Sequence, residues 1–263
     1  MRKIVLFFLA SFLIISCSVR QPAAVQAGES QDPLLLSVLW FQKSAEMKAL
    51  FIQGYNIAQK SLDEKLAKKE NSKQGIIIMD IDETVLDNSP SEVYLIRNGV
   101  PFSDEIWKKW VKMASAKACP GALEFVRYAQ SKNIEVFYVT NRETPDELEP
   151  TIKNLTALGF PYADNAHLIL KAGISSKEQR RQALAEKYDI LMLIGDNLAD
   201  FNVAFDIRGA DLGAGEVEKQ RQKFGTDYII LPNPMYGPWI NAAVREKPGD
   251  TNREKIMNSL EGF

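Results

Sequence analysis

Histidine and cysteine are scarce in this sequence, and both shortages exclude whole classes of site. His167 is the single histidine, so a zinc site built from several histidines is excluded by count. The signatures of the histidine phosphatases and of a Ser-His-Asp site are absent as well. Cys119 is followed six positions later by Phe125, where the loop of a cysteine phosphatase would need arginine. We therefore expect His167 to pack at a strand edge and Cys119 to pack as a small apolar residue.

An excess of charge of one sign is also missing. The 263 residues include 32 basic and 34 acidic side chains, which gives a formal net charge of −2. A protein that wraps nucleic acid on a basic face needs a clear basic excess, so no nucleic-acid partner is expected. Hydrophobic residues make up 46% of the chain, which is enough for a sizeable core. Packing has to stabilise that core, because Cys17 lies in a predicted leader and leaves Cys119 without a disulfide partner.

The apolar run near the N-terminus is too short to span a bilayer comfortably. It covers residues 4–15, follows Arg2 and Lys3, and ends just before Cys17. The ending Leu-Ile-Ile-Ser-Cys resembles a bacterial lipoprotein signal, which implies cleavage before Cys17 and lipidation of that cysteine. An ordinary signal peptide or a short anchor helix is the alternative. Ser18 after the cysteine resembles outer-membrane sorting, so we expect a lipid-anchored protein of the bacterial cell envelope, in the outer membrane.

The rest of the chain divides into segments of different pattern. Apolar residues recur at three- and four-residue steps from Leu36 to Leu62, which predicts one amphipathic helix packed on the protein itself. An aromatic-rich stretch after Pro90 interrupts the later pattern and predicts a small cap over a site. We therefore predict a lipoprotein signal at 1–17, a flexible tether at 18–33, a helical segment at 34–74, and a larger domain at 75–263 with a cap insertion at about 88–119.

The most informative stretch begins with the apolar run at 76–79, which is typical of a strand buried on both faces of a parallel sheet. Asp80 and Asp82 come at its carboxyl end, the edge at which open α/β sheets bind ligands. Two neighbouring carboxylates repel each other, so a cation or a shared proton is implied. A calcium loop of the EF-hand kind would need Gly and Glu where this chain has Val85 and Ser91, and that alternative fails.

Short apolar runs then alternate with amphipathic segments. Strands are expected at 76–79, 135–139, 167–170, 190–194 and 227–231, and helices at 121–132, 145–158 and 175–187. This alternation predicts an α/β fold: a Rossmann-like parallel sheet with right-handed crossovers and a small, mainly helical cap.

Polar residues useful for phosphate chemistry follow four of these strands. They are Asp80 and Asp82, then Thr140, then Lys177, then Asp196 and Asp200. The ordered set resembles the four motifs of the haloacid dehalogenase superfamily. Together with DIDETVLDNSP, VTNR, GDNLADF and the lipoprotein signal, it resembles the class C acid phosphatases, bacterial surface lipoproteins with four catalytic aspartates. The resemblance covers nearly the whole mature chain, and residues 75–263 would form the catalytic domain.

A phosphate monoester is a dianion, and it repels a carboxylate nucleophile unless positive charge lies between them. Mg²⁺ held by oxygen ligands supplies that charge. We predict that Asp80 attacks phosphorus to give an aspartyl phosphate, while Asp82 protonates the ester oxygen and later deprotonates water. The Thr140 hydroxyl and the Asn141 backbone N–H would hold phosphoryl oxygens, and Lys177 would offset their charge. Because Asp82 needs its proton, a low pH optimum is expected.

The metal ligands follow from the resemblance. It implies that Asp196 binds Mg²⁺ directly, together with Asp80 and the backbone carbonyl of Asp82. Asp200 comes one helical turn after Asp196, so it would bind the metal through water or orient Lys177. The alternative for Asp196 and Asp200 is a helix N-terminus stabilised by acidic residues.

The substrate prediction also follows from the resemblance. The family acts on nucleoside 5′-monophosphates and related phosphomonoesters, with the base stacked between one aromatic residue of the cap and one of a late loop. Trp107 and Tyr236 occupy the matching positions, although core packing stays open for Trp107 and is preferred for Trp110. A phosphotransferase on the same scaffold and a non-catalytic surface binding lipoprotein are the alternative functions. A homodimer is left open.

Overall fold

The structure is a computed structural model that describes residues 33–68, 73–244 and 252–262. Cys17, the predicted signal and the tether up to residue 32 lie outside the described residues. No helix of the described ranges is long and apolar enough to cross a membrane.

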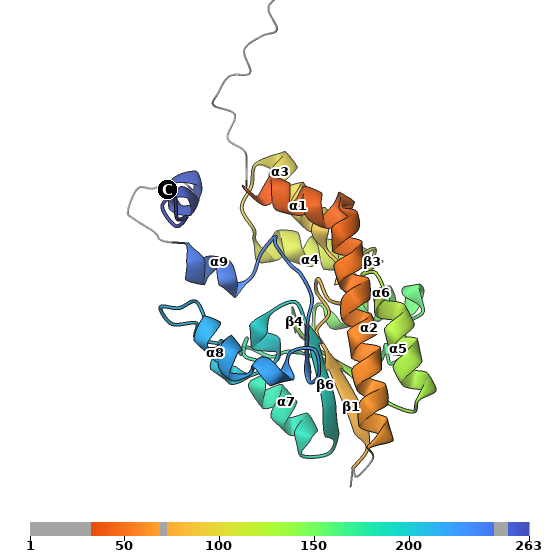
Figure 1. Ribbon diagram of the computed structural model, residues 1–263. Coiled ribbons are helices and arrows are strands. Elements are labelled where there is room, and N and C mark those ends of the chain that lie inside the picture. The colour runs from red at the N-terminus through yellow and green to blue at the C-terminus, as the bar shows by residue number, and fades with distance from the viewer. Residues whose placement is uncertain (1–32, 69–72, 245–251, 263) are drawn as a thin grey trace, which may run out of the picture. The chain divides into compact units, whose positions relative to one another are not determined.

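A five-stranded parallel sheet forms the centre of the fold (Figure 1), with strand order β5-β4-β1-β6-β7. Its strands are β1 (Gly75–Met79), β4 (Glu135–Glu143), β5 (Leu168–Lys171), β6 (Asp189–Gly195) and β7 (Tyr228–Ile230). β1 is buried along its whole length between β4 and β6. The predicted Rossmann-like α/β sheet is therefore confirmed, with β1 at its middle.

The two faces of the sheet carry separate apolar layers, because alternate strand residues point to opposite sides. Ile77 and Met79 of β1 pack in the larger layer, and Ile76 and Ile78 pack in the smaller one. The larger layer includes buried residues of α2, α5 (Ala122–Ser131) and α6 (Leu148–Leu158). The smaller layer lies under α7 (Glu178–Ala185) and the short turns that follow β6. Figure 1 shows α2 and α5 on one side of the sheet and α7 and α8 (Ala214–Lys219) on the other.

The N-terminal helical segment differs from the single helix that its periodicity predicts. It forms α1 (Pro33–Lys43) and α2 (Ala45–Ala67), which are separated at Ser44. Ser44 has an extended backbone, and its hydroxyl accepts a hydrogen bond from the Met47 N–H at 3.0 Å. A serine in this position caps a helix N-terminus, so it starts a new helix instead of continuing the old one.

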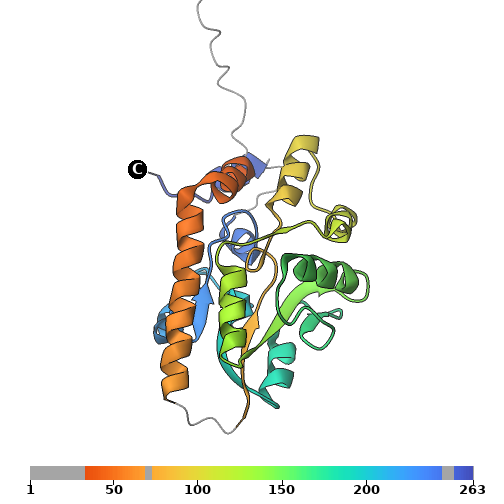
Figure 2. The same ribbon diagram turned by 90° about the vertical axis from the view of Figure 1, so that its right-hand side faces the viewer.

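The break also changes which apolar residues are covered. Leu36, Leu39, Leu50 and Ile57, all part of the predicted apolar face, are exposed. α2 nevertheless packs closely on the sheet, and Figure 2 shows it running alongside. At Gly54 an added Cβ would lie 2.6 Å from a methyl carbon of Leu231, so a side chain there would push the helix outward.

The segment between β1 and α5 has two helices, α3 (Ser89–Asn98) and α4 (Asp104–Met113). A small antiparallel pair, β2 (Leu86–Asp87) with β3 (Lys117–Ala118), joins its two ends. The sequence pattern indicated the helices but not this pair, because two-residue strands carry no readable alternation. After β7 come α9 (Pro238–Ala243) and α10 (Asn252–Met257).

The two scarce residue types occupy packed positions, as expected. The His167 ring lies between the rings of Phe137 and Tyr162, with centroid distances of 4.9 Å to each. Cys119 is buried in the larger apolar layer. Neither residue lines the cavity described below.

Candidate active site

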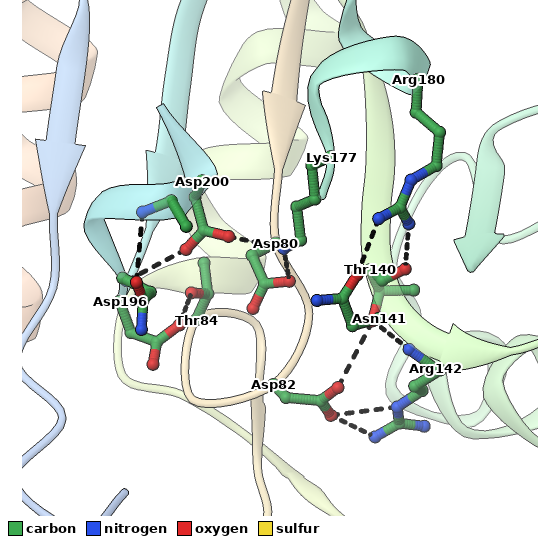
Figure 3. A network of polar contacts seen from close by, with 12 residues as sticks. Asp80, Asp82, Thr84, Thr140, Asn141, Arg142, Lys177, Arg180, Asp196 and Asp200 are labelled. Carbon is green, nitrogen blue, oxygen red and sulfur yellow. Dashed lines mark hydrogen bonds and ion pairs between the residues drawn. The ribbon is translucent and has the colours of Figure 1, made fainter. Parts of the chain in front are cut away.

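Asp80 follows β1 directly and is nearly buried, with its backbone N–H bonded to the Ile194 carbonyl of β6 at 2.9 Å. Its carboxylate accepts a hydrogen bond from the Lys177 ammonium, which also donates to Asp200 Oδ1 at 2.6 Å (Figure 3). Lys177 is the N-cap residue of α7, an unfavourable place for a cation unless anions contact it. Two carboxylates provide that contact, so the sequence places the ammonium against Asp80.

Burial raises the pKa of Asp80 well above its ordinary value; Lys177 opposes this rise, and Asp200, Asp196 and Asp82 reinforce it. The pKa of Lys177 is raised overall. Burial lowers it, but the negative charges of Asp200 and Asp80 together raise it by more, so the ammonium stays charged. Three buried or half-buried carboxylates then face one ammonium, which leaves two negative charges when all three are ionised. One divalent cation would neutralise this excess.

The geometry of these carboxylates fits such a cation. Asp80, Asp196 and Asp200 each offer a carboxylate oxygen, and these oxygens lie within 4.8 Å of one another. Oxygen ligands of this kind are those that Mg²⁺ prefers. Burial, reinforced by Asp200, raises the pKa of Asp196 to about 7. Asn233 opposes that rise, because its amide donates to Asp196 Oδ2 at 2.9 Å.

Asp200 has both of its oxygens engaged. Oδ1 accepts from Lys177, and Oδ2 accepts from the Asn197 N–H at 3.0 Å. Asp200 approaches the backbone closely here: a Cβ added at Gly195 would lie 2.6 Å from Asp200 Cβ. The contact with Lys177 favours the second of the two predicted roles for Asp200, in which it orients the ammonium.

Asp82 turns away from this group and toward Arg142. Asp82 Oδ1 accepts from Arg142 Nη2 at 2.8 Å, from Arg142 Nε at 3.0 Å, and from the Asn88 amide at 2.8 Å. Among the described residues, Oδ2 has a single, longer contact, 3.3 Å from the Thr140 hydroxyl. Its predicted contribution to metal binding, through the backbone carbonyl, stays a prediction.

Thr140 and Asn141 lie in the last part of β4, which continues to Glu143 and not only to residue 139 as predicted. The Thr140 hydroxyl contacts Asp82 and accepts from the Arg142 N–H at 3.1 Å, while Asn141 is exposed to the cavity. Arg180 Nη1 donates to the Thr140 carbonyl at 2.5 Å, and its Nη2 donates to Asn141 Oδ1 at 2.7 Å (Figure 3). Arg142 and Arg180 are polar groups of the site that the sequence reasoning missed. The signal for Arg142 was present, as the last residue of the VTNR motif.

A cavity of about 620 Å³ joins these groups to α3 and α4. Trp107 and Tyr236 both line it. The Trp107 ring lies over the Arg142 guanidinium at 5.7 Å and near the Phe102 ring at 6.4 Å. Trp110 packs instead against the apolar layer, and its indole N–H donates to Asn88 Oδ1 at 2.8 Å. The cavity therefore brings together most of the predicted site residues: Asp80, Asp82, Trp107, Asn141, Lys177, Asp196, Asp200 and Tyr236.

Comparison with known proteins identifies the family. The family model described as HAD superfamily, subfamily IIIB (acid phosphatase), matches residues 18–239. The chain is 38% identical to the class C acid phosphatase of Bacillus anthracis, covering 88% of this chain and 97% of that one, with a TM-score of 0.80. A structure of the Bacillus anthracis enzyme with tungstate bound matches at 37% identity with the same coverage and TM-score. The stem 31 kDa glycoprotein of Glycine max is 24% identical, covering 89% of this chain and 98% of that protein. The resemblance seen in the sequence is confirmed: this chain belongs to the acid phosphatases of subfamily IIIB of the haloacid dehalogenase superfamily, and it is a phosphomonoester hydrolase.

Proposed function

We propose that this phosphatase depends on Mg²⁺ and hydrolyses nucleoside 5′-monophosphates through an aspartyl phosphate on Asp80. The observation that carries the proposal is the position of Asp80, which contacts Lys177 and lies with Asp196 and Asp200 in one carboxylate group. The same cavity is lined by the aromatic side chains Trp107 and Tyr236.

The proposed reaction has two steps. The Asp80 carboxylate attacks phosphorus, the bond from phosphorus to the ester oxygen breaks, and the departing alcohol takes a proton from Asp82. Water then attacks the phosphoryl group on Asp80, Asp82 takes a proton from that water, and phosphate leaves with Asp80 restored. Lys177 stabilises the charge on the phosphoryl oxygens. Bound Mg²⁺, held by Asp80, Asp196 and the Asp82 carbonyl, would offset the repulsion between the dianion and Asp80.

The contacts of Asp82 support its role in proton transfer. Arg142 and Asn88 both bond to Oδ1. In the part of the chain that the structure describes, Oδ2 has only the 3.3 Å contact with Thr140, and it is therefore the oxygen that would carry the proton. Arg142 thus fixes the carboxyl group without occupying the oxygen that reacts.

The size and lining of the cavity support a nucleotide as substrate. About 620 Å³ is within the range of small-molecule sites. Flat aromatic side chains favour a nucleobase, which would stack on Trp107 and Tyr236. The Bacillus anthracis enzyme was solved with tungstate, a tetrahedral oxyanion like phosphate. That supports the binding of a tetrahedral oxyanion, such as a phosphoryl group, by this chain.

Phosphate release from several nucleoside 5′-monophosphates and several small sugar phosphates tests the proposal, with Mg²⁺ and with chelator. We expect Mg²⁺-dependent release that favours the nucleotides and is lost in Asp80→Asn. Equal rates on sugar phosphates would contradict the substrate class, and activity in excess chelator would contradict the metal. An added alcohol acceptor separates phosphotransfer from hydrolysis in the same assay.

The proposal includes a lipid anchor on Cys17 that holds the enzyme in the outer membrane of a bacterial cell envelope. It rests on the sequence of residues 2–18, since these lie outside the described part of the structure. Cys17→Ser should abolish incorporation of labelled palmitate and release the enzyme from the membrane fraction. Unchanged fractionation of that variant would exclude the anchor. The homodimer stays a prediction.

A further inference from the structure

Glu92 is a buried carboxylate without a partner. It lies on α3, is 7% exposed, and lines the same cavity as Asp82 and Trp107. Within residues 33–68, 73–244 and 252–262, no hydrogen-bond donor contacts its carboxylate. Glu83 differs because it does not line this cavity: its Oε1 accepts from the Asn88 N–H at 2.7 Å, and its Oε2 is buried with no partner among the described residues.

The oxygens of Glu92 are open to the cavity, because they are not among the fully buried side-chain atoms that lack a partner in the described residues. A polar group in this position can be paired by a ligand as well as by water. Burial raises the pKa of Glu92 to about 6, and no neighbouring charge contributes. A carboxylate that faces a substrate cavity and has no protein partner is an acceptor that a ligand can use.

The position of Glu92 indicates which part of the ligand it would reach. Asn88 is the N-cap residue of α3 and contacts Asp82, which would protonate the ester oxygen. Glu92 follows four residues later on the same face of the helix, about 6 Å further along its axis. The part of a substrate nearest to this helix would therefore be the group attached to the ester oxygen.

We propose that Glu92 binds the sugar hydroxyl groups of the substrate, so that the enzyme selects ribonucleotides; the inference rests on the proposed function. An ionised carboxylate can only accept hydrogen bonds, and the two neighbouring hydroxyl groups of a sugar can donate to it. Glu92 does not touch the reacting atoms. It would act on substrate specificity, as one of the residues that line the cavity together with Trp107 and Tyr236.

The test compares kcat/KM for adenosine 5′-monophosphate with kcat/KM for its 2′,3′-dideoxy analogue at pH 7, above the pKa of about 6 of Glu92, so that its carboxylate is ionised. The wild-type enzyme should favour the ribonucleotide about ten-fold, as expected for hydrogen bonds to a charged group. Glu92→Leu should bring the ratio to about one, and Glu92→Gln, which keeps a neutral acceptor, should give an intermediate ratio. The control is Glu105→Gln on α4, whose carboxylate is exposed and paired with Lys109. It should keep the wild-type ratio.

A wild-type ratio of one, or a wild-type ratio retained in Glu92→Leu, would overturn the proposal. Thermal unfolding checks that the leucine variant is folded; if it is not, the ratio in Glu92→Gln decides. Inosine 5′-monophosphate lacks the exocyclic amine of adenosine 5′-monophosphate. If Glu92→Leu changed the preference between these two nucleotides and left the ratio of ribonucleotide to dideoxy analogue unchanged, the donor would be on the base, and the proposal would also be overturned. Failure of the proposed function looks different, because nucleotides would then be no better than small sugar phosphates.

Discussion

Arg142 and Asp82 form a two-bond ion pair on a single carboxylate oxygen. Nη2 and Nε of Arg142 lie 2.8 and 3.0 Å from Asp82 Oδ1. The arginine side chain is 1% exposed, donates to the Thr151 hydroxyl at 3.0 Å, and lies under the Trp107 ring. A guanidinium fixed in this way determines which oxygen of Asp82 faces the cavity. Arg142 is thus a positioning residue that links Trp107 of α4 to Asp82, the proposed proton donor.

Arg142→Lys should affect substrates according to their leaving groups. Lysine cannot reproduce the two-bond contact, so Asp82 loses its orientation. Alkyl phosphates need a protonated leaving group, and we expect their kcat/KM to fall about 100-fold. For p-nitrophenyl phosphate, whose leaving group departs without a proton, we expect a loss below about five-fold. Steady-state kinetics on both substrates provide the measurement.

The matched control for that variant is Arg127→Lys. Arg127 is exposed and donates only to the Gly159 carbonyl at 3.3 Å, so both substrates should keep their rates. Equal losses on the two substrates in Arg142→Lys would show that the arginine supports the fold or the phosphate and does not position Asp82.

The stability of the metal-free protein should fall as the pH rises. Burial raises the pKa of Asp80, and it raises the pKa of Asp196 to about 7, whereas an unfolded aspartate titrates near about 3.9. A raised folded-state pKa stabilises the fold below the unfolded value, and that stability is lost as pH rises through the folded value. The melting temperature in chelator should therefore decrease from pH 5 to 7.5, as followed by circular dichroism.

Mg²⁺ should reverse this trend. Its ligands must be deprotonated, so the added metal should raise the melting temperature more at pH 7.5 than at pH 5. Asp196→Asn removes one titrating carboxyl group and should flatten the pH dependence of the metal-free protein. A melting temperature that rises with pH in chelator, with no response to Mg²⁺ at either pH, would disprove the carboxylate group as a metal site.

Gly195→Ala should disable the site without replacing a charged residue. The added Cβ would lie 2.6 Å from Asp200 Cβ and Cγ, so Asp200 has to move and its contact with Lys177 is lost. We expect activity to fall about 100-fold and the free energy of unfolding to decrease by about 1–3 kcal/mol. Kinetics and urea unfolding measure the two effects. Wild-type activity in this variant would mean that the position of Asp200 is not required.

The sequence predicts the sheet and the grouping of its polar residues well, because short buried strands followed by acidic residues form a pattern with few alternatives. The helix break at Ser44 was missed, since an apolar repeat continues across a capping serine without interruption. Arg142 and Asn88 were missed for another reason. Their roles depend on contacts with Asp82 and Trp110, and a polar residue has many possible partners that spacing along the chain does not reveal.

The same limit applies to Glu92 and Arg180. A glutamate on a cap helix and an arginine on α7 are ordinary surface residues by pattern. Only the fold shows that one is buried beside the cavity and that the other donates to the Thr140 carbonyl. The catalytic roles of Asp80, Asp82, Thr140, Asn141 and Lys177 stay predictions, although the structure places these residues around one site.

The central claim is that Asp80 accepts the phosphoryl group. Acid quenching during turnover of a labelled nucleotide, followed by peptide mapping, tests it most directly. We predict one phosphoryl group on the peptide that contains Asp80, present in the wild-type enzyme with Mg²⁺ and absent in Asp80→Asn. A label on another residue, or hydrolysis that continues in Asp80→Asn, would contradict it.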